Sequence, residues 1–175
     1  SVAVAVMWRE VFNREGLINA ILGQFGQPSI WWLGHPDYAI WTLILLAAWQ
    51  FGSPMLIFLA GLKQIPEQLY ESASIDGANG LQKFVRITLP LLSPTTFFVT
   101  VVYAINSFQV FGQVYMMTQG GPAHATSTMV YSIYQNAFQF FRMGYASALA
   151  WVLFAAIFLL TLVQVRFQRT WVHYE

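Results

Sequence analysis

The chain has 175 residues, of which 57% are hydrophobic, 17% are aromatic and only 9% are charged. Soluble domains carry about 25% charged residues, because a water-facing surface needs them. Eight basic and seven acidic side chains cannot cover a globule of this size, so much of the surface must face lipid. A net charge of +1 without a basic run excludes a nucleic-acid interface, and the absence of Cys excludes disulfides and thiolate metal sites.

The first eight residues form a short apolar piece that runs directly into the charged residues 9–15. We expect this piece to be the end of a membrane helix whose beginning precedes the sequence. A short N-terminal anchor or a signal segment is the alternative, although no basic region precedes the piece and no small-residue cleavage site follows it.

Three uncharged stretches follow, at 38–62, 87–141 and 143–165, and each can hold the roughly 20 apolar residues of a membrane helix. Within the middle stretch, 118–128 reads TQGGPAHATST, a loop that a bilayer core would not accept. The next segment, 129–141, is too short to cross and is expected to be an interfacial or partly buried helix. We therefore predict an all-α integral membrane protein with complete spans at about 39–61, 91–115 and 144–166.

The basic residues predict the orientation of these spans. Three spans in series place the 63–90 loop and the C-terminal tail on the same side of the membrane. Five of the eight basic residues lie on that side: Lys63, Lys83, Arg86, Arg166 and Arg169. The positive-inside rule therefore places the 63–90 loop and the tail in the cytoplasm.

The 63–90 loop is predicted to contain two short helices joined by a glycine turn. Pro66 suits the first position of a helix, Gly77 suits the position after its end, and Asn79 can cap a second helix through Arg86. The loop has no net charge, and Glu67 and Glu71 lie one turn apart on one face. Helices that lie on anionic lipid are normally rich in Lys and Arg. The residues alone leave two interpretations open, a pair of helices on the membrane surface or an acidic face for a basic protein partner.

The same loop carries a spaced motif. Its members are Glu71, Ser72 and Ala73, then Gly77 after three residues, Ile87 after nine more, and finally Leu89 and Pro90. This motif resembles the EAA loop of ABC-importer permeases, E-A-A-x3-G-x9-I-x-L-P, with Ser72 as the one departure. The phrases GLKQIP at 61–66, LYESASIDGA at 69–78, TQGGP at 118–122 and WVHYE at 171–175 are similar to the carbohydrate-uptake type. They resemble specifically the first permease of a lactose-, maltose- or glycerol-phosphate-like pair.

The resemblance implies a six-helix core of which this chain is the C-terminal part, with three complete spans plus the end of a fourth. It implies a multi-pass protein of a bacterial or archaeal inner membrane, surrounded by lipid. The implied protein partners are an ABC ATPase dimer, a second permease subunit and an extracytoplasmic solute-binding protein. By the same analogy the seven motif residues couple to the ATPase, with Glu71 meeting a basic residue and Gly77 supplying the turn. The sequence contains no G-x-x-x-x-G-K-[ST] motif, so we expect this chain to bind no cofactor and ATP-Mg to be bound by the partner ATPase.

Polar residues within the predicted spans indicate a solute path. Tyr103, Asn106 and Ser107 share a helix face, and the same periodicity adds Gln113 seven residues after Asn106. Trp49 and Gln50 precede the FGSP break at 51–54, which frees backbone groups that can line a cavity. Amides that face lipid are costly, so these side chains either bond neighbouring helices or line a path for polyhydroxylated solutes. Both interpretations remain open.

Other function classes can be compared with an importer subunit. An intramembrane enzyme would need acid-base, nucleophilic or metal-binding groups at membrane depth, and the predicted spans contain no Asp, Glu, His or Cys. The three His residues are far apart in the sequence, so we expect no catalytic or metal site. We predict a transporter subunit that forms half of the path for a sugar or related solute. A passive channel or a structural membrane subunit is the alternative, and the EAA-like loop argues against both.

Overall fold

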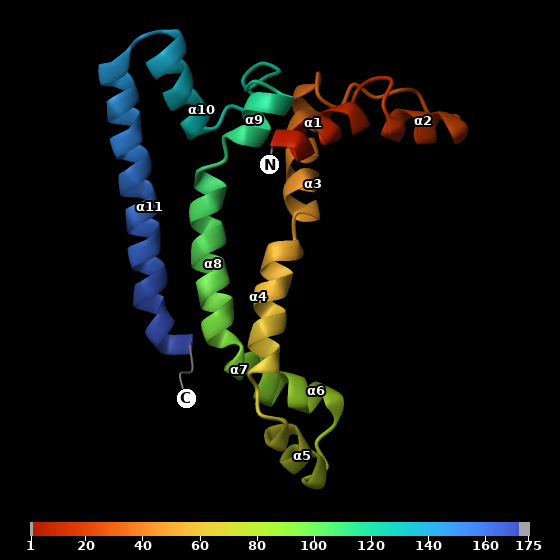
Figure 1. Ribbon diagram of the computed structural model, residues 1–175, viewed down its shortest axis with the longest axis vertical. Helices are drawn as coiled ribbons and strands as arrows, with labels where there is room; N and C mark the ends of the chain where they lie inside the picture. Colours follow the sequence, from red (N-terminus) through yellow and green to blue (C-terminus); the bar gives the residue numbers. More distant parts are fainter. Residues whose placement is uncertain (1, 172–175) are drawn as a thin grey trace. The chain divides into compact units, whose positions relative to one another are not determined.

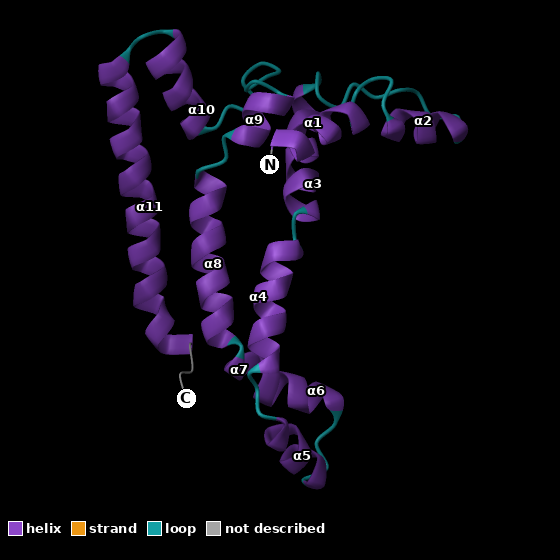
Figure 2. Ribbon diagram, viewed as in Figure 1, coloured by secondary structure: helices purple, strands orange, loops and turns teal. Residues whose placement is uncertain are grey.

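The computed structural model describes residues 2–171, with side chains described as far as residue 168. All regular structure in this range is helical, and no strand occurs among the described residues (Figure 2). The all-α expectation is therefore confirmed. Ser1, the side chain of Arg169 and most of the WVHYE phrase lie outside the described part of the chain.

The chain divides into two compact units. Unit 1 comprises Ser1–Gln50 and Asn106–Ala156, and unit 2 comprises Phe51–Ile105 and Ile157–Glu175. Two helices contribute to both units, namely α8 (Ser93–Phe108) and α11 (Met143–Trp171). Figure 1 labels both helices.

Unit 1 is built around a small apolar core. Its complete helices are α1 (Val2–Val11), α2 (Leu17–Gln24), α3 (Pro36–Trp49), α9 (Gly112–Met117) and α10 (Met129–Tyr134). Helix α1 packs against α9, and Ala5, Leu46 and Met117 are buried together. The predicted short helix after the TQGGP loop forms as α10, followed by a π-helical turn over Gln135–Gln139.

Helix length and hydropathy identify the segments that can cross a membrane. Pro36–Lys63, which contains α3 and the following α4, and Met143–Gln168 of α11 are long and apolar enough. A third segment qualifies only as a bent pair, Gly80–Leu91 with Ser93–Phe108, at an angle of 59°. The first span is interrupted between Trp49 and Gly52, where the sequence predicts a break before Pro54.

Asn19 organises the connection between α1 and α3 within unit 1. Its amide nitrogen donates to the carbonyl oxygens of Arg14 and Ile30 at 3.0 and 2.8 Å. Its amide oxygen accepts from the Ile30 backbone N–H at 3.0 Å and from Trp32 Nε1 at 3.1 Å. Asn19 is only 7% exposed, so these bonds take the place of the hydrogen bonds that its side chain would otherwise make to water.

Replacement of this side chain is expected to destabilise unit 1. Asn19→Ala removes the partner of the Arg14 carbonyl and of the Ile30 N–H and carbonyl, which are partly buried, and we expect a loss of about 3 kcal/mol in the free energy of unfolding. Gln24→Ala, at an exposed position of the same helix, is the matched control. Thermal unfolding of the full-length protein in detergent measures both, and equal melting temperatures for the two variants would contradict this role.

Unit 2 contains the 63–90 loop. Its elements are α4 (Gly52–Lys63), α5 (Glu67–Ile75), α6 (Gly80–Lys83), a π-helical turn (Phe84–Thr88), α7 (Leu89–Leu91) and most of α8. The run from Gly80 to Leu91 is continuously helical, so the second helix extends past the predicted end at Arg86. Pro66 is the residue before the first helical position and not the first position itself.

Two prolines explain the bend between α7 and α8. Neither Pro90 nor Pro94 has an N–H to donate to the carbonyl four residues earlier, so the helical ladder is interrupted twice. The Pro90 carbonyl oxygen, which an N–H at position 94 would otherwise reach, accepts a hydrogen bond from Ser93 Oγ at 2.6 Å. Ser93 therefore satisfies a backbone group at the bend.

Candidate functional site

The first half of the EAA-like motif lies on α5 and in the turn that ends it. Gly77 has φ of +76°, a left-handed conformation that side chains disfavour. The Ala78 N–H donates to the Ala73 carbonyl at 2.9 Å, and the Gly77 N–H donates to the Ser74 carbonyl at 3.1 Å. These two bonds form a Schellman motif, so the predicted glycine turn is confirmed together with its reason for needing glycine.

The second helix begins at a capping box. Asn79 Oδ1 accepts from the Gln82 N–H at 2.9 Å, and Gln82 Oε1 accepts from the Asn79 N–H at 2.8 Å. The predicted cap by Asn79 is confirmed, and Gln82 is its partner. The turn is thus closed on both sides by local hydrogen bonds.

Two hydrogen bonds join α5 to the helical run that follows the turn. Lys83 Nζ donates to Ser74 Oγ at 2.6 Å, and the hydroxyls of Tyr70 and Thr88 lie 2.8 Å apart. Sequence reasoning missed all four of these residues. The two bonded residues are nine positions apart in one bond and eighteen in the other, and both bonds are centred on residues 78–79 of the turn. This symmetry could have indicated that the two helices run antiparallel.

The surface of α5 and its turn is acidic, the whole segment exposes apolar side chains, and Arg86 is exposed beside Phe84 and Val85. Glu67, Glu71 and Asp76 are exposed, as is Ser72, whereas Ala73 is half-buried. Large apolar side chains are exposed beside them, to 87% for Ile75 and 73% for Leu81. Others are about half exposed: Leu69, Phe84, Val85 and Leu89. We call these exposed acidic and apolar side chains, which lie between residues 67 and 89, the coupling surface, after the role that is proposed for them below.

Two other motif residues, Ile87 and Pro90, are half-buried and are not part of the coupling surface. Ile87 is half-buried in the π-helical turn, and Pro90 lies at the bend that leads into α8. The motif therefore combines exposed residues, one turn glycine and the residues that begin the next membrane helix.

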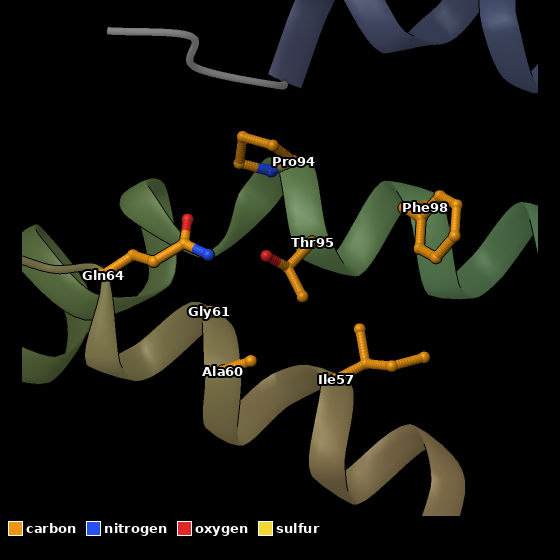
Figure 3. Close-up of a pocket in the computed structure, with 7 residues that line it drawn as sticks. All are labelled: Ile57, Ala60, Gly61, Gln64, Pro94, Thr95 and Phe98. Carbon is orange, nitrogen blue, oxygen red and sulfur yellow. The ribbon is translucent and has the colours of Figure 1, made fainter.

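Helices α4 and α8 approach each other closely beside this segment. A Cβ atom at Gly61 would lie 2.7 Å from Thr95 Oγ1 and 3.1 Å from Leu92 Cδ2. Figure 3 shows Thr95 between the two helices, in an open groove of about 380 Å³ that Ile57, Gln64 and Phe98 also line. Gly61, in the GLKQIP phrase, is thus needed because a larger residue would not fit between α4 and α8.

Enlarging Gly61 is expected to separate these helices. Gly61→Val should lower the stability of the protein by about 2 kcal/mol, because the added methyl groups overlap Thr95 and Leu92. Gly52→Ala is the control, since no atom lies within 4 Å of a Cβ at that position. The melting temperature in detergent reports the difference; a Gly61→Val protein as stable as Gly52→Ala would refute the close approach.

The residues predicted to line a solute path fall into three places. Tyr103, Asn106 and Ser107 share the exposed side of α8, as their spacing predicts. The continuation of this face to Gln113 is wrong, because α8 ends at Phe108 and Gln113 belongs to α9. For the same reason no single helix covers the predicted span 91–115.

Trp49 and Gln50 lie at the end of α3. Trp49 is 52% exposed and its ring centroid is 5.7 Å from that of Trp8, whereas Gln50 is half-buried at the helix end. Among the residues that the structure describes, no group of three or more His, Cys, Asp or Glu side chains is arranged to hold a metal ion.

Sequence comparison identifies relatives for almost the whole chain. The chain matches the family model of the binding-protein-dependent transport system inner membrane component over residues 1–173. The probable ABC transporter permease protein YesP of Bacillus subtilis is 50% identical, over 100% of this chain and 58% of the relative. The sulfoquinovosyl glycerol transport permease SmoG of Agrobacterium fabrum is 41% identical, over 89% and 51%. The sn-glycerol-3-phosphate transport permease UgpA of the same species is 40% identical, over 97% and 58%.

Structure comparison gives the same fold. A crystal structure of a bacterial ABC transporter that imports the acidic polysaccharide alginate matches with a TM-score of 0.88 at 24% identity, over 97% of this chain and 60% of the matched chain. The transporter in complex with its pentasaccharide-bound periplasmic protein matches with a TM-score of 0.86. The chain therefore belongs to the family of binding-protein-dependent inner membrane components, the permease subunits of ABC transporters. It spans a little over half the length of these relatives.

Proposed function

We propose that this chain is part of a membrane subunit of an ATP-driven importer, and that the coupling surface binds a separate ATPase in the cytoplasm. The observation that carries the proposal is the EAA-spaced motif on a helix-turn-helix whose acidic and apolar side chains are exposed. The subunit itself would catalyse no reaction.

The character of the coupling surface favours a protein partner over a lipid surface. Exposed apolar patches outside the spans mark interaction sites. A helix that lies on anionic lipid would present Lys and Arg beside its apolar residues. Here Glu67, Glu71 and Asp76 are the exposed charges of α5 and its turn, and they would be repelled by such a membrane. Arg86 is the exposed basic residue of the run that follows, so the acidic character belongs to α5. The acidic charges suit a groove with a basic residue.

The energy for transport would come from the ATPase. ATP binding would close an ATPase dimer, and the coupling segments of this permease and of a second permease would move with it. The continuous run Gly80–Leu91 would carry that motion toward α8. In this arrangement the 63–90 loop and the C-terminus lie in the cytoplasm, as the distribution of basic residues predicts.

The solute is proposed to be a sugar or another polyhydroxylated compound delivered by an extracytoplasmic binding protein. The relatives' names include glycerol-3-phosphate and sulfoquinovosyl glycerol, and the matched alginate transporter was crystallised with its periplasmic protein. Tyr103, Asn106 and Ser107 expose hydrogen-bonding groups on one side of α8. Hydroxyl-rich solutes need such donors and acceptors, whereas lipid would make an exposed amide costly.

This path can be tested with Asn106→Leu. We expect the variant to raise the solute concentration for half-maximal transport about tenfold, since one polar contact to the solute is worth about 1.4 kcal/mol or more when buried. Thr100→Val, also exposed on α8, is the control and should transport normally. Uptake of the solute that the cognate binding protein retains measures the effect; unchanged affinity and specificity would remove Asn106 from the path.

Co-purification tests the class of protein. The full-length permease, tagged and extracted in mild detergent, should retain an ATPase with a Walker motif and a second permease. A passive channel or a structural subunit would retain neither protein. Absence of the ATPase and of the second permease from the purified material would overturn the proposal.

A further inference from the structure

Within unit 2, the hydroxyl pair of Tyr70 and Thr88 lies at the junction of the coupling helix and the membrane helix. Thr88 is only 7% exposed, and its Oγ1 lies 2.8 Å from the Tyr70 hydroxyl. Tyr70 directly precedes Glu71 on α5, whereas Thr88 ends the π-helical turn and precedes the bend at Pro90. This contact therefore connects the helix that carries the acidic motif to the segment that leads into α8.

The π-helical turn determines where Thr88 points. Its closing bond runs from the Leu89 N–H to the Phe84 carbonyl, five residues earlier. A turn with one additional residue rotates the side chains at its C-terminal end by about 100° relative to an uninterrupted α-helix. Such single π-helical turns are rare and are frequently found at functional positions.

Without the hydroxyl pair, α5 would be tied to the next helix mainly near the turn. The Schellman motif at Gly77 and the capping box at Asn79 close one end, and Lys83 holds Ser74 close to that end. Glycine turns permit rotation about their backbone. The bond between Tyr70 and Thr88 lies farther from the turn than the bond between Lys83 and Ser74, so it opposes pivoting of α5 more effectively.

We propose that Tyr70 and Thr88 are positioning residues that lock α5 to the Gly80–Leu91 run, so that force applied to α5 reaches α8 instead of bending the turn. The proposal rests on the proposed function for its purpose, since a partner must apply the force. The lock itself is a property of this chain and can be measured with or without the ATPase.

The test uses spin labels on α5 and α8 of the full-length permease in its complex. Cysteines replace the exposed Gln68 and Thr100, and the 175 residues contain no Cys of their own. Pulsed electron paramagnetic resonance gives the distribution of distances between the two labels. It is measured without nucleotide and again after the complex is trapped with ATP and vanadate. The labelled protein that keeps Tyr70 and Thr88 should give one narrow distribution of distances in both states.

Tyr70→Phe and Thr88→Val each remove one hydroxyl of the lock. We expect either variant to raise the population at displaced distances about fivefold, the factor for a hydrogen bond of about 1 kcal/mol. Thr88→Ser keeps the hydroxyl and should restore the narrow distribution. The double variant should be no broader than either single variant, because both changes remove the same bond. Tyr145→Phe, at an exposed position outside the coupling surface, should change nothing.

The two proposals fail in different ways. A narrow distribution in Tyr70→Phe, or a double variant that is much broader than the single variants, would overturn the lock. Loss of the ATPase from the unmodified complex would overturn the proposed function, while the same distances in the permease alone would still decide whether the lock exists.

Discussion

Glu71→Lys is expected to abolish solute-stimulated ATP hydrolysis by the assembled importer. Glu71 is an exposed acidic residue of α5 within the coupling surface, and reversing its charge would place two basic residues opposite each other at the ATPase. Loss of a buried interfacial charge pair costs about 2–5 kcal/mol, so we expect binding of the ATPase to weaken about 100-fold.

The control for this variant is Gln68→Lys. Gln68 is also exposed on α5, and its substitution adds the same positive charge at a neighbouring position. ATP hydrolysis by the reconstituted complex, with and without solute-loaded binding protein, measures both variants. If Glu71→Lys keeps the stimulation seen in the unmodified complex, this residue does not couple the two proteins.

Gly77→Val is expected to have a comparable effect on transport through a different cause. The left-handed conformation at Gly77 disfavours a β-branched residue by more than about 1–2 kcal/mol, so the Schellman motif should open and α5 should change direction. The acidic and apolar side chains of α5 would then no longer face the ATPase together.

Gly80→Ala is the matched control for this turn. Both glycines have no neighbouring atom within 4 Å of a Cβ position, but only Gly77 has a positive φ. ATPase retention and transport should be lost in Gly77→Val and kept in Gly80→Ala. Equal behaviour of the two variants would show that the conformation of the turn is not required.

Features that depend on neighbouring residues could be predicted from the sequence. The turn at Gly77 and the cap at Asn79 follow from backbone chemistry that acts over four or five positions, and both are present in the structure. The spans predicted from composition at about 39–61 and 144–166 correspond to Pro36–Lys63 and Met143–Gln168 in the structure. The motif resembles that of the family because its spacing includes the same helix, glycine turn and second helix.

Features that depend on packing could not be predicted in this way. The periodicity after Asn106 continues to Gln113 without Pro, and only Gly112 interrupts it, yet α8 ends at Phe108. The reason lies in unit 1, where α9 packs against α1 and so does not continue α8. The pairing of Tyr70 with Thr88 likewise depends on how α5 folds back and on a π-helical turn, which has no local signal in FVRIT.

Site-specific cross-linking tests the central claim most directly. A photoreactive amino acid at Ile75, which is 87% exposed beside the turn, should form an adduct with the ATPase in the native complex. The same probe at Trp151, which is 72% exposed on α11, should form none. Adducts with the ATPase from Ile75 alone are the predicted result. The contradicting result is an ATPase that is present in the complex but cross-links equally from both positions, or from neither. The coupling surface would then not be its binding site.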